Sequence, residues 1–327
     1  MIEPKQVIIE VTSRCNLKCK YCPTLEKGAP AHDMDLDFFK SIVDRITLEM
    51  PDTTVIPWMN GEPLLNPNYY EMIKYITDRK LRAYITTNAT IWENDFFHHI
   101  TDKNSIYQLI FSLDGLPNTG SIEKARPGMN ESIVLSNIHR FLRLKNSKKK
   151  NIDLGIKLCR RGQDWGEAED YIKYWLNTRG IDFVCVGDAL VDDEGGIRTK
   201  PCQYPDNNFM VIRWDGSVVF CAYNLTMTNN PDYAVGKLDS KESLLSFYNN
   251  KKFDNFRRLQ NMGVYHPPCN KCGFAYTGIG YEGKIKFRNW NKTIYHSKDY
   301  YNGFYSLKKK RKNKSYYSPG GKLETYR

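Results

Sequence analysis

Short apolar runs alternate along the first 190 residues with longer segments in which apolar residues recur at helical spacing. The short runs are rich in Val, Ile, Leu and aromatic residues, as is typical of strands buried on both faces. The predicted strands are residues 6–12, 53–59, 81–87, 107–113, 152–158 and 181–187. The predicted helices between them are residues 35–49, 66–79, 94–101, 132–146 and 164–178.

This alternation predicts an α/β fold with a parallel sheet and helical crossovers. A closed TIM barrel needs eight strand–helix units, so six units predict an open, partial (βα)6 TIM-like barrel. In barrels the chemistry lies at the C-terminal ends of the strands, and the polar motifs of this chain fall there.

The character of the chain changes after residue 190. We expect a partial barrel at 1–190, a linker at 191–200, a small cysteine-containing domain at 201–275 and a basic extension at 276–327. The linker is acidic and contains Gly, which favours a loop. The extension is rich in Tyr, Lys, Asn and Gly and shows no clear period.

Most of the positive charge belongs to the extension. The formal net charge is +11, and residues 276–327 contain 13 Lys and Arg but only 3 Asp and Glu. Three interpretations stay open, ranked in this order: a tail that solubilises the protein or packs on the barrel, a site for an anionic metabolite, and a nucleic-acid contact. Clustered basic residues among aromatic ones suit phosphates and single strands, which is the argument for the third.

The sequence predicts a cytoplasmic protein with no membrane partner. No apolar run reaches the roughly 18 residues that a membrane-spanning helix needs, and the N-terminus does not have the pattern of a signal peptide. Disulfides are not expected in the cytoplasm. The nine Cys are unevenly spaced, and their close groups therefore indicate metal or cluster ligands.

Cys15, Cys19 and Cys22 follow the first predicted strand with the spacing C-x3-C-x2-C. A structural zinc site takes four nitrogen or sulfur ligands, whereas only three thiols lie close together here. Three thiolates on a cubane cluster leave one iron open.

With this motif the chain resembles the radical S-adenosylmethionine (SAM) superfamily, and the resemblance covers most of its length. The resemblance implies that Cys15, Cys19 and Cys22 hold a [4Fe–4S] cluster whose open iron chelates SAM. Reductive cleavage of SAM then yields a 5′-deoxyadenosyl radical that removes hydrogen from unactivated C–H bonds, while the protein supplies orientation and excludes water. Tyr21, the aromatic residue before the third Cys, belongs to the same pattern.

Gly61, Glu62 and Pro63 follow the second strand and look like the family's Gly-Gly-Glu-Pro motif, with Asn60 in place of the first Gly. The resemblance implies that Glu62 and the local backbone bind the SAM amino group. An ordinary turn between strand and helix is the alternative interpretation.

Other polar residues end the later strands in the family's order. The resemblance assigns Asn88 and Asp114 to the SAM site, Ser112 to the ribose, Arg126 to the SAM carboxylate and Leu158 to the adenine. A guanidinium fork suits a carboxylate. Asp114 with the following Gly is also the pattern of a plain turn, and Leu158 that of a core residue.

Cys202, Cys221, Cys269 and Cys272 form a second set, with Gly216 in a G-x4-C element before Cys221. This pattern resembles the auxiliary-cluster domains of the SPASM/Twitch group. No Cys follows Cys272, so the shorter Twitch type is expected, with four Cys holding one auxiliary [4Fe–4S] cluster. A four-cysteine zinc ribbon is the alternative.

Two Cys remain outside these sets. Cys159 follows the fifth strand, where a thiol could return a hydrogen atom to a substrate radical, as in epimerase-type members of the family. The alternative, which we favour, is a buried thiol that acts as a small apolar side chain. Cys185 lies within the sixth strand and is predicted to belong to the core.

The predicted function is hydrogen abstraction from a substrate C–H bond with SAM as co-substrate, as a net oxidation of a small anionic or sugar-like metabolite. The alternative is a peptide-modifying enzyme that forms thioethers or epimerises residues. The first strand begins by residue 6, so no leader-recognition segment is expected before the barrel, which favours the metabolite. The expected partners are the substrate and a flavodoxin- or ferredoxin-type electron donor. The alternative hypothesis, an iron–sulfur protein that only binds nucleic acid, is supported by the basic extension alone.

Overall fold

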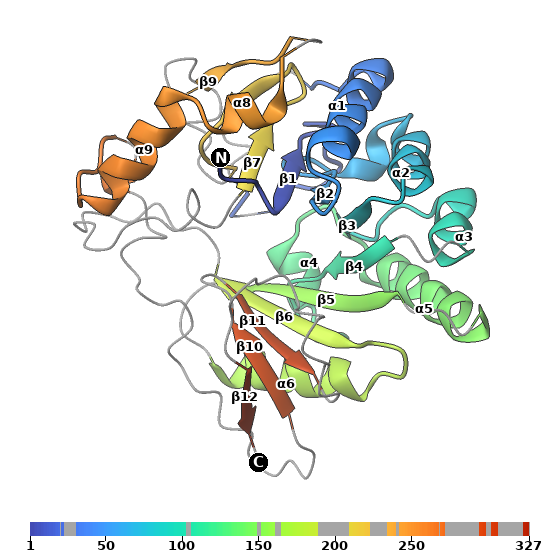
Figure 1. Cartoon of the computed structure of the whole chain (residues 1–327). Helices are drawn as coiled ribbons and strands as arrows, with labels where there is room; N and C mark the ends of the chain where they lie inside the picture. The colour runs from blue at the N-terminus through green and yellow to red at the C-terminus, as the bar shows by residue number, and fades with distance from the viewer. Residues whose placement is uncertain are drawn as a thin grey trace.

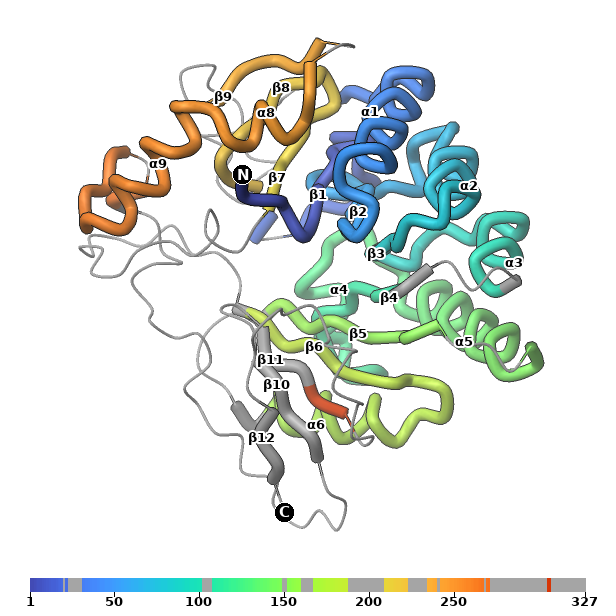
Figure 2. Tube along the Cα trace, viewed as in Figure 1, coloured from blue at the N-terminus to red at the C-terminus, as the bar shows by residue number. Residues whose placement is uncertain are grey.

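The structure is a computed structural model (Figures 1 and 2). It describes residues 1–19, 21–22, 31–102, 106–148, 152–160, 165–188, 209–222, 234–239, 242–267, 269–271, 294–298, 302–306 and 323–326. The predicted linker at 191–200 lies outside the described residues. In the described part, no helix is long and apolar enough to cross a membrane.

Six parallel strands form the centre of the molecule, and each overlaps its predicted range. They are β1 (Gln6–Ile9), β2 (Thr54–Ile56), β3 (Arg82–Thr87), β4 (Ile106–Ser112), β5 (Asp153–Arg160) and β6 (Phe183–Asp188). Each pairs in parallel with the next, from Val7 opposite Val55 to Ile156 opposite Val184. The predicted parallel sheet is therefore confirmed.

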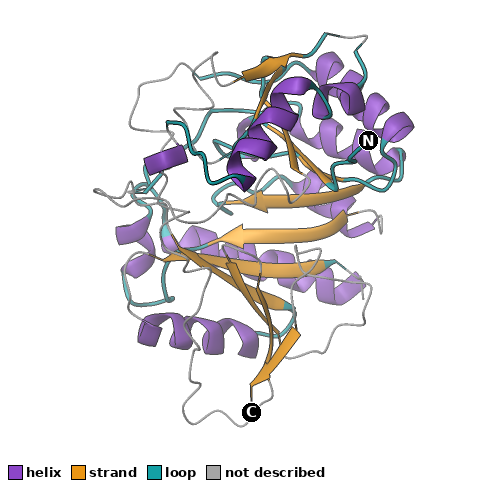
Figure 3. Cartoon of the chain, turned by 60° about the vertical axis from the view of Figure 1, so that its left-hand side comes forward, coloured by secondary structure: helices purple, strands orange, loops and turns teal. Residues whose placement is uncertain are grey.

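Helices connect these strands and lie around their outer side (Figures 1 and 3). They are α1 (Leu36–Glu49), α2 (Tyr69–Asp78), α3 (Asn94–Asp102), α5 (Glu131–Lys148) and α6 (Trp165–Asn177). The sequence pattern did not reveal α4 (Ser121–Ala125) and the 3-10 turn η1 (Pro63–Leu65), which are too short to show a period. Helix α1 begins at Asp35, whose carboxylate accepts the Phe38 N–H at 2.9 Å.

Alternate residues of the strands belong to two apolar clusters. Val7 and Ile9 of β1 pack toward the helices, together with Phe39 and Ile42 of α1. Ile8 points the other way, into a second cluster on the inner face of the sheet. Because neighbouring residues of a strand face opposite sides, both faces of β1 are buried, which explains its continuous apolar run.

The sheet is open, as expected for a partial barrel. Among the described residues its strand order is β12-β10-β11-β6-β5-β4-β3-β2-β1-β7-β8-β9. The second region supplies β7 (Phe209–Ile212), β8 (Ser217–Val219) and β9 (Ala234–Lys237), followed by α8 (Leu244–Tyr248) and α9 (Lys251–Asn261). Strand β7 pairs in parallel with β1, so this region continues the sheet of the barrel.

Side-chain hydrogen bonds also fix the second region on α1. Arg45 donates to the carbonyls of Asp239 and Glu242 at 2.9 and 3.0 Å. The Glu49 carboxylate accepts the Ser243 hydroxyl at 2.7 Å. The two regions are therefore joined by strand pairing on one side and by helix contacts on the other.

The extension contains strands that the sequence did not predict. They are β10 (Ile294–Lys298), β11 (Asn302–Ser306) and β12 (Leu323–Tyr326). Strand β11 pairs antiparallel with β6 and so covers the edge of the barrel sheet. The extension lacks a hydrophobic periodicity and yet forms strands, because an edge strand is held by backbone hydrogen bonds to a partner that is distant in sequence. The basic run at 308–314 lies outside the described residues.

Candidate functional site

The loop after β1 carries Cys15, Cys19 and Cys22, all partly buried. Backbone bonds shape it: the Cys22 N–H donates to the Cys19 carbonyl at 3.0 Å, and the Lys18 N–H donates to the Pro127 carbonyl at 2.9 Å. The loop is therefore tied to the segment that follows α4.

The three thiols are electrostatic neighbours. Burial raises the pKa of the Cys15 thiol and raises that of Cys19 to about 11. Cys22 contributes to both shifts, whereas the Arg126 guanidinium opposes them. In the described part of the chain, no three Cys, His, Asp or Glu side chains form a group that would hold a single metal ion.

Glu62 is 2% exposed and lies beside this loop. Its carboxylate accepts the Thr87 hydroxyl at 2.6 Å, the Asn88 N–H at 2.7 Å and the Leu64 N–H at 3.2 Å. Burial raises the pKa of Glu62 to about 7, although these three donors act in the opposite direction. The carboxyl group is thus held in place, and its ionisation is sensitive to any cation that approaches it.

Gly61 brings the Glu62 turn close to the cysteine loop. Its φ is +75°, and a Cβ atom on it would lie 2.5 Å from the Arg14 carbonyl oxygen and 2.9 Å from that of Thr12. The Glu62 N–H donates to the same Arg14 carbonyl at 2.7 Å. Only glycine fits here, because both the backbone conformation and the close approach exclude a side chain.

We expect Gly61→Ala to lower the free energy of unfolding by about 3 kcal/mol or more, since strain from positive φ adds to overpacking. Gly263→Ala is the matched control, because Gly263 has φ +74° with nothing within 4 Å of an added Cβ. It should cost only about 1–2 kcal/mol. Denaturant unfolding of both variants measures the difference; equal losses would contradict the role given to the close approach.

Asn60, which replaces a glycine of the family motif, has a partner of its own. Its amide donates to the Glu10 carboxylate at 2.8 Å, and Arg213 donates to the other Glu10 oxygen at 3.2 Å. Glu10 is 1% exposed. This cluster of Asn60, Glu10 and Arg213 joins the ends of β1, β2 and β7. Sequence reasoning missed it, although a Glu that ends an apolar run was a usable signal.

Asn88 and Ser112 lie at the same edge of the sheet. The Asn88 amide donates to Asn16 of the cysteine loop at 3.0 Å, and the Asn88 side-chain oxygen accepts the Thr90 N–H at 2.9 Å. Ser112 ends β4 and is 8% exposed. Asn88 therefore links the end of β3 to the loop that carries the three thiols.

Asp114 is the centre of a buried network. Its carboxylate accepts Arg126 Nε at 2.5 Å, the Cys159 N–H at 2.6 Å and the Tyr21 hydroxyl. Burial disfavours the charge on Arg126, but Asp114 and the thiols of Cys19 and Cys159 outweigh it, so the pKa of Arg126 is raised. Asp114 therefore links Tyr21 of the cysteine loop to Arg126 and to the end of β5.

We expect Asp114→Asn to destabilise the protein by about 3–5 kcal/mol, because it leaves the Arg126 charge buried without its partner. Asp37→Asn is the control: this Asp is exposed in its 3.6 Å ion pair with Lys40, and its loss should cost less than about 1 kcal/mol. Unfolding midpoints in urea measure both. A small effect at Asp114 would mean that solvent reaches the network.

The structure places Leu158 in the core. It lies on β5 opposite Val186 of β6 and packs in the cluster under the helices. Cys159, next along the strand, is partly buried, and its backbone N–H binds Asp114. Cys185 is buried in the inner cluster, as the sequence predicted.

The second cysteine set is described in part. Cys221 follows β8 and is partly buried, and Cys269 begins the 3-10 turn η3 (Cys269–Lys271) and is buried. Cys202 and Cys272 lie outside the described residues. Gly216 has φ +86°, and an added Cβ would lie 2.8 Å from the Phe38 ring of α1. The glycine of the G-x4-C element thus permits close packing on the barrel.

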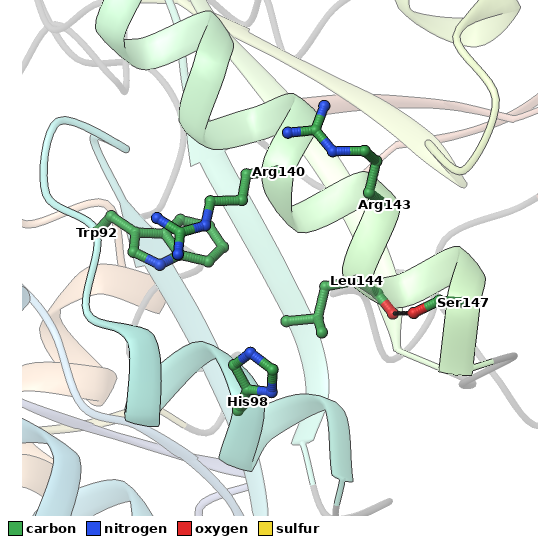
Figure 4. A pocket seen from close by; sticks show the side chains of 6 residues that line it. All are labelled: Trp92, His98, Arg140, Arg143, Leu144 and Ser147. Atoms are coloured by element: carbon green, nitrogen blue, oxygen red, sulfur yellow. Dashed lines mark hydrogen bonds between the residues drawn. The ribbon is translucent and has the colours of Figure 1, made fainter.

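A separate pocket of about 410 Å³ lies between α3 and α5 (Figure 4). The side chains that line it are Trp92, His98, Arg140, Arg143, Leu144 and Ser147. Arg140 lies over the Trp92 ring at 4.3 Å. This pocket is on the helical outside of the barrel, and none of the predicted site residues lines it.

The structure thus combines an open parallel barrel, three thiols in the loop after its first strand and a cysteine-containing region on the same sheet. The radical SAM superfamily model matches residues 9–164, and the model of the SPASM iron–sulfur cluster-binding domain matches residues 202–273. The chain belongs to the radical SAM superfamily and has a SPASM iron–sulfur domain. Its cofactors are a [4Fe–4S] cluster that binds SAM, an auxiliary cluster and SAM itself.

Several curated proteins are similar in sequence to this chain. The tungsten-containing aldehyde ferredoxin oxidoreductase cofactor-modifying protein of Pyrococcus furiosus is 23% identical over 82% of this chain and 87% of its own length. The AdoMet-dependent heme synthase of Methanosarcina barkeri is 28% identical over 34% of this chain and 32% of its own length. The second match therefore covers about a third of either protein.

Solved structures share the fold. The anSMEcpe structure with bound AdoMet has a TM-score of 0.60 and 16% identity, over 84% of this chain and 88% of that one. Streptococcus suis SuiB bound to precursor peptide SuiA has a TM-score of 0.60 and 13% identity, over 78% of this chain and 67% of that one. These likenesses confirm the open-barrel architecture.

Proposed function

We propose that the protein oxidises a small metabolite by removing hydrogen from one of its C–H bonds, and that the auxiliary cluster accepts the second electron. The observation that supports this best is the attachment of the second region beside the cysteine loop. Arg213 binds Glu10 at the mouth of the barrel, and Trp214 stacks on His32 with ring centroids 3.8 Å apart. An electron acceptor held this firmly can take an electron from the substrate without touching it.

The chain's own residues then have distinct roles. Cys15, Cys19 and Cys22 hold the first cluster, which together with SAM supplies the hydrogen-abstracting radical when bound. Glu62 accepts a hydrogen bond from the SAM amino group, and Asn88, Ser112 and Arg126 contact the remainder of SAM. The residues that position these groups are Tyr21, Gly61, Pro63 and Asp114. Leu158 packs in the cluster under the helices, which supports its interpretation as a core residue, and its contact with adenine stays a proposal.

Glu62→Gln should weaken SAM binding by roughly 10- to 100-fold, because a charged hydrogen-bond acceptor for the SAM amino group becomes a neutral one. The ionised carboxylate is the stronger acceptor, so SAM affinity of the unchanged protein should rise as the pH passes through about 7. The variant should lack that rise. Anaerobic equilibrium dialysis with SAM measures both; an unaltered affinity would remove Glu62 from the site.

The metabolite is preferred over a peptide because of the relatives' names. The curated relatives include a cofactor-modifying protein, heme synthases and a GTP 3′,8-cyclase, and all of these names refer to small molecules. A peptide is the alternative, since SuiB was solved with a precursor peptide. The four Cys of the second set favour an auxiliary cluster without an open iron, which suits electron transfer better than substrate ligation.

The test is to supply reduced, reconstituted enzyme and SAM with either a defined set of cellular metabolites or a set of peptides. A metabolite should increase 5′-deoxyadenosine formation and lose two hydrogens in mass. Stimulation by peptides alone would overturn the choice of substrate. A flavodoxin- or ferredoxin-type protein is the proposed electron donor, and should replace the chemical reductant in the same assay.

Four minor proposals are independent of the substrate class. Cys159 is proposed to act as a small apolar side chain, and the alternative of a hydrogen donor is supported only by the contact of its backbone N–H with Asp114. The extension is proposed to stabilise the barrel, since β11 covers the edge of β6. Nucleic acid ranks last among the partners, and the cytoplasm is the proposed compartment.

A further inference from the structure

The inner face of the barrel sheet contains polar side chains as well as apolar ones. Ile8, Tyr84, Ile110 and Phe183 form an apolar cluster on this face, and Trp58 packs against it. By the alternation of strands, Thr86 shares a face with Tyr84, and Gln108 shares one with Ile110. We call this inner space the lumen.

Several polar atoms of the lumen have no hydrogen-bond partner within the described part of the chain. They are the Trp58 indole N–H, the Thr86 hydroxyl, both ends of the Gln108 amide and the Gln6 side-chain oxygen. Gln108 is 0% exposed, and Thr86 and Gln6 are each 8% exposed. A buried polar group without a hydrogen-bond partner destabilises the folded protein, so a set of them on one face indicates that something polar binds there.

Trp58 and Thr86 lie close to the edge of the sheet that carries the proposed SAM contacts. Trp58 precedes Asn60 by two residues, and Thr86 precedes Asn88 by two residues. The Trp58 and Tyr84 rings are 6.0 Å apart, which places an aromatic wall beside the two donors. Gln108 lies opposite Tyr84 in the register of β4 and β3, nearer the N-terminal end of the strands.

In the part of the chain that the structure describes, the charged side chains at this end of the sheet have partners. Glu10 binds Asn60 and Arg213, and Asp114 binds Arg126. Lys157, on the inner face of β5, also has an interaction partner. Among the described residues, the groups left for a ligand are therefore neutral donors and acceptors. They match a hydroxyl, carbonyl or amide group, whereas a carboxylate or phosphate would enter without a counter-charge.

We propose that the lumen binds the reacting end of the substrate, that this end is uncharged, and that Trp58 and Thr86 donate hydrogen bonds to it. This rests on the proposed function, and it narrows the substrate class: any charge on the metabolite lies away from the carbon that loses hydrogen. Gln108 and Gln6 form the deeper end of the site. Trp58 and Thr86 are thus specificity-determining residues.

The test uses SAM-loaded holoenzyme labelled with fluorotryptophan, in which Trp58→Phe assigns the Trp58 fluorine resonance. The probes are three neutral compounds and their anionic counterparts: myo-inositol with myo-inositol phosphate, glycerol with glycerol phosphate, and acetamide with acetate. The neutral members should shift the Trp58 resonance in a saturable way, and their counterparts should bind at least about tenfold more weakly. Iron content verifies that each variant is loaded.

Thr86→Val keeps the shape of the side chain and removes its hydroxyl, so it should weaken neutral-probe binding roughly 3- to 10-fold. Thr101→Val is the matched control, because the Thr101 hydroxyl already binds the Phe97 carbonyl on α3. Trp175 is a control resonance: its indole N–H is also unpaired, but it packs outside the sheet. Thr101→Val should bind the neutral probes as tightly as the unchanged protein does, and the Trp175 resonance should not shift.

The outcomes separate this inference from the proposed function. If the anionic probes bind as tightly as the neutral ones, if no probe moves the Trp58 resonance, or if Thr86→Val has no effect, the inference is wrong. If a peptide proves to be the substrate while acetamide still binds through Thr86, the lumen assignment stands and the metabolite proposal fails.

Discussion

Replacing Cys15, Cys19 and Cys22 together by Ala is expected to abolish the formation of 5′-deoxyadenosine from SAM. The unchanged protein, reconstituted anaerobically, should contain about eight iron and eight sulfide per chain from two cubanes, and the triple variant about four of each. The loss should be complete rather than partial, because the loop after β1 contributes all three thiols of this set. Iron analysis and chromatography of the SAM products measure the two effects.

Cys185→Ala provides the control, since Cys185 is a buried thiol of the inner cluster and belongs to neither cysteine set. It should keep the full iron content and the slow SAM cleavage that occurs without substrate. A triple variant that still made 5′-deoxyadenosine would refute the assignment of the first cluster. About four iron plus one zinc in the unchanged protein would instead overturn the auxiliary cluster.

Replacing Cys269 and Cys272 by Ala is expected to abolish the oxidised product while sparing 5′-deoxyadenosine. Hydrogen abstraction leaves a substrate radical, and a net two-electron oxidation requires that this radical give up one more electron and a proton. The auxiliary cluster is the proposed acceptor, so its loss should interrupt the reaction after abstraction. One SAM is consumed per turnover in this scheme.

Isotopes make this prediction specific. Deuterium from the attacked carbon should appear in 5′-deoxyadenosine in both the unchanged protein and the double variant, because abstraction precedes the electron transfer. The iron content of the double variant should fall to about four per chain. Full product from the double variant would show that the second cluster is structural, and the preference for dehydrogenation would lose its main support.

Much of the barrel could be predicted from local sequence. The strands β1 to β6 coincide with apolar runs because both faces of a parallel sheet are covered, and this leaves a continuous signal in the chain. The cysteine spacing after β1 was equally local, since all ligands of the first set lie within eight residues. The strands of the extension could not be predicted from local sequence, because their stability comes from pairing with β6 and with each other.

The candidate site, too, could be predicted only in part from the sequence. Sequence alone determined the class of enzyme and the residues that end the strands, because each motif is a short run whose chemistry depends on neighbours along the chain. Only the tertiary structure decided that Asp114 binds Tyr21, Arg126 and the Cys159 backbone, and that Asn60 and Arg213 share Glu10. These contacts join residues far apart in sequence, and a contact that depends on how the strands pair in the sheet leaves no periodic pattern in either segment.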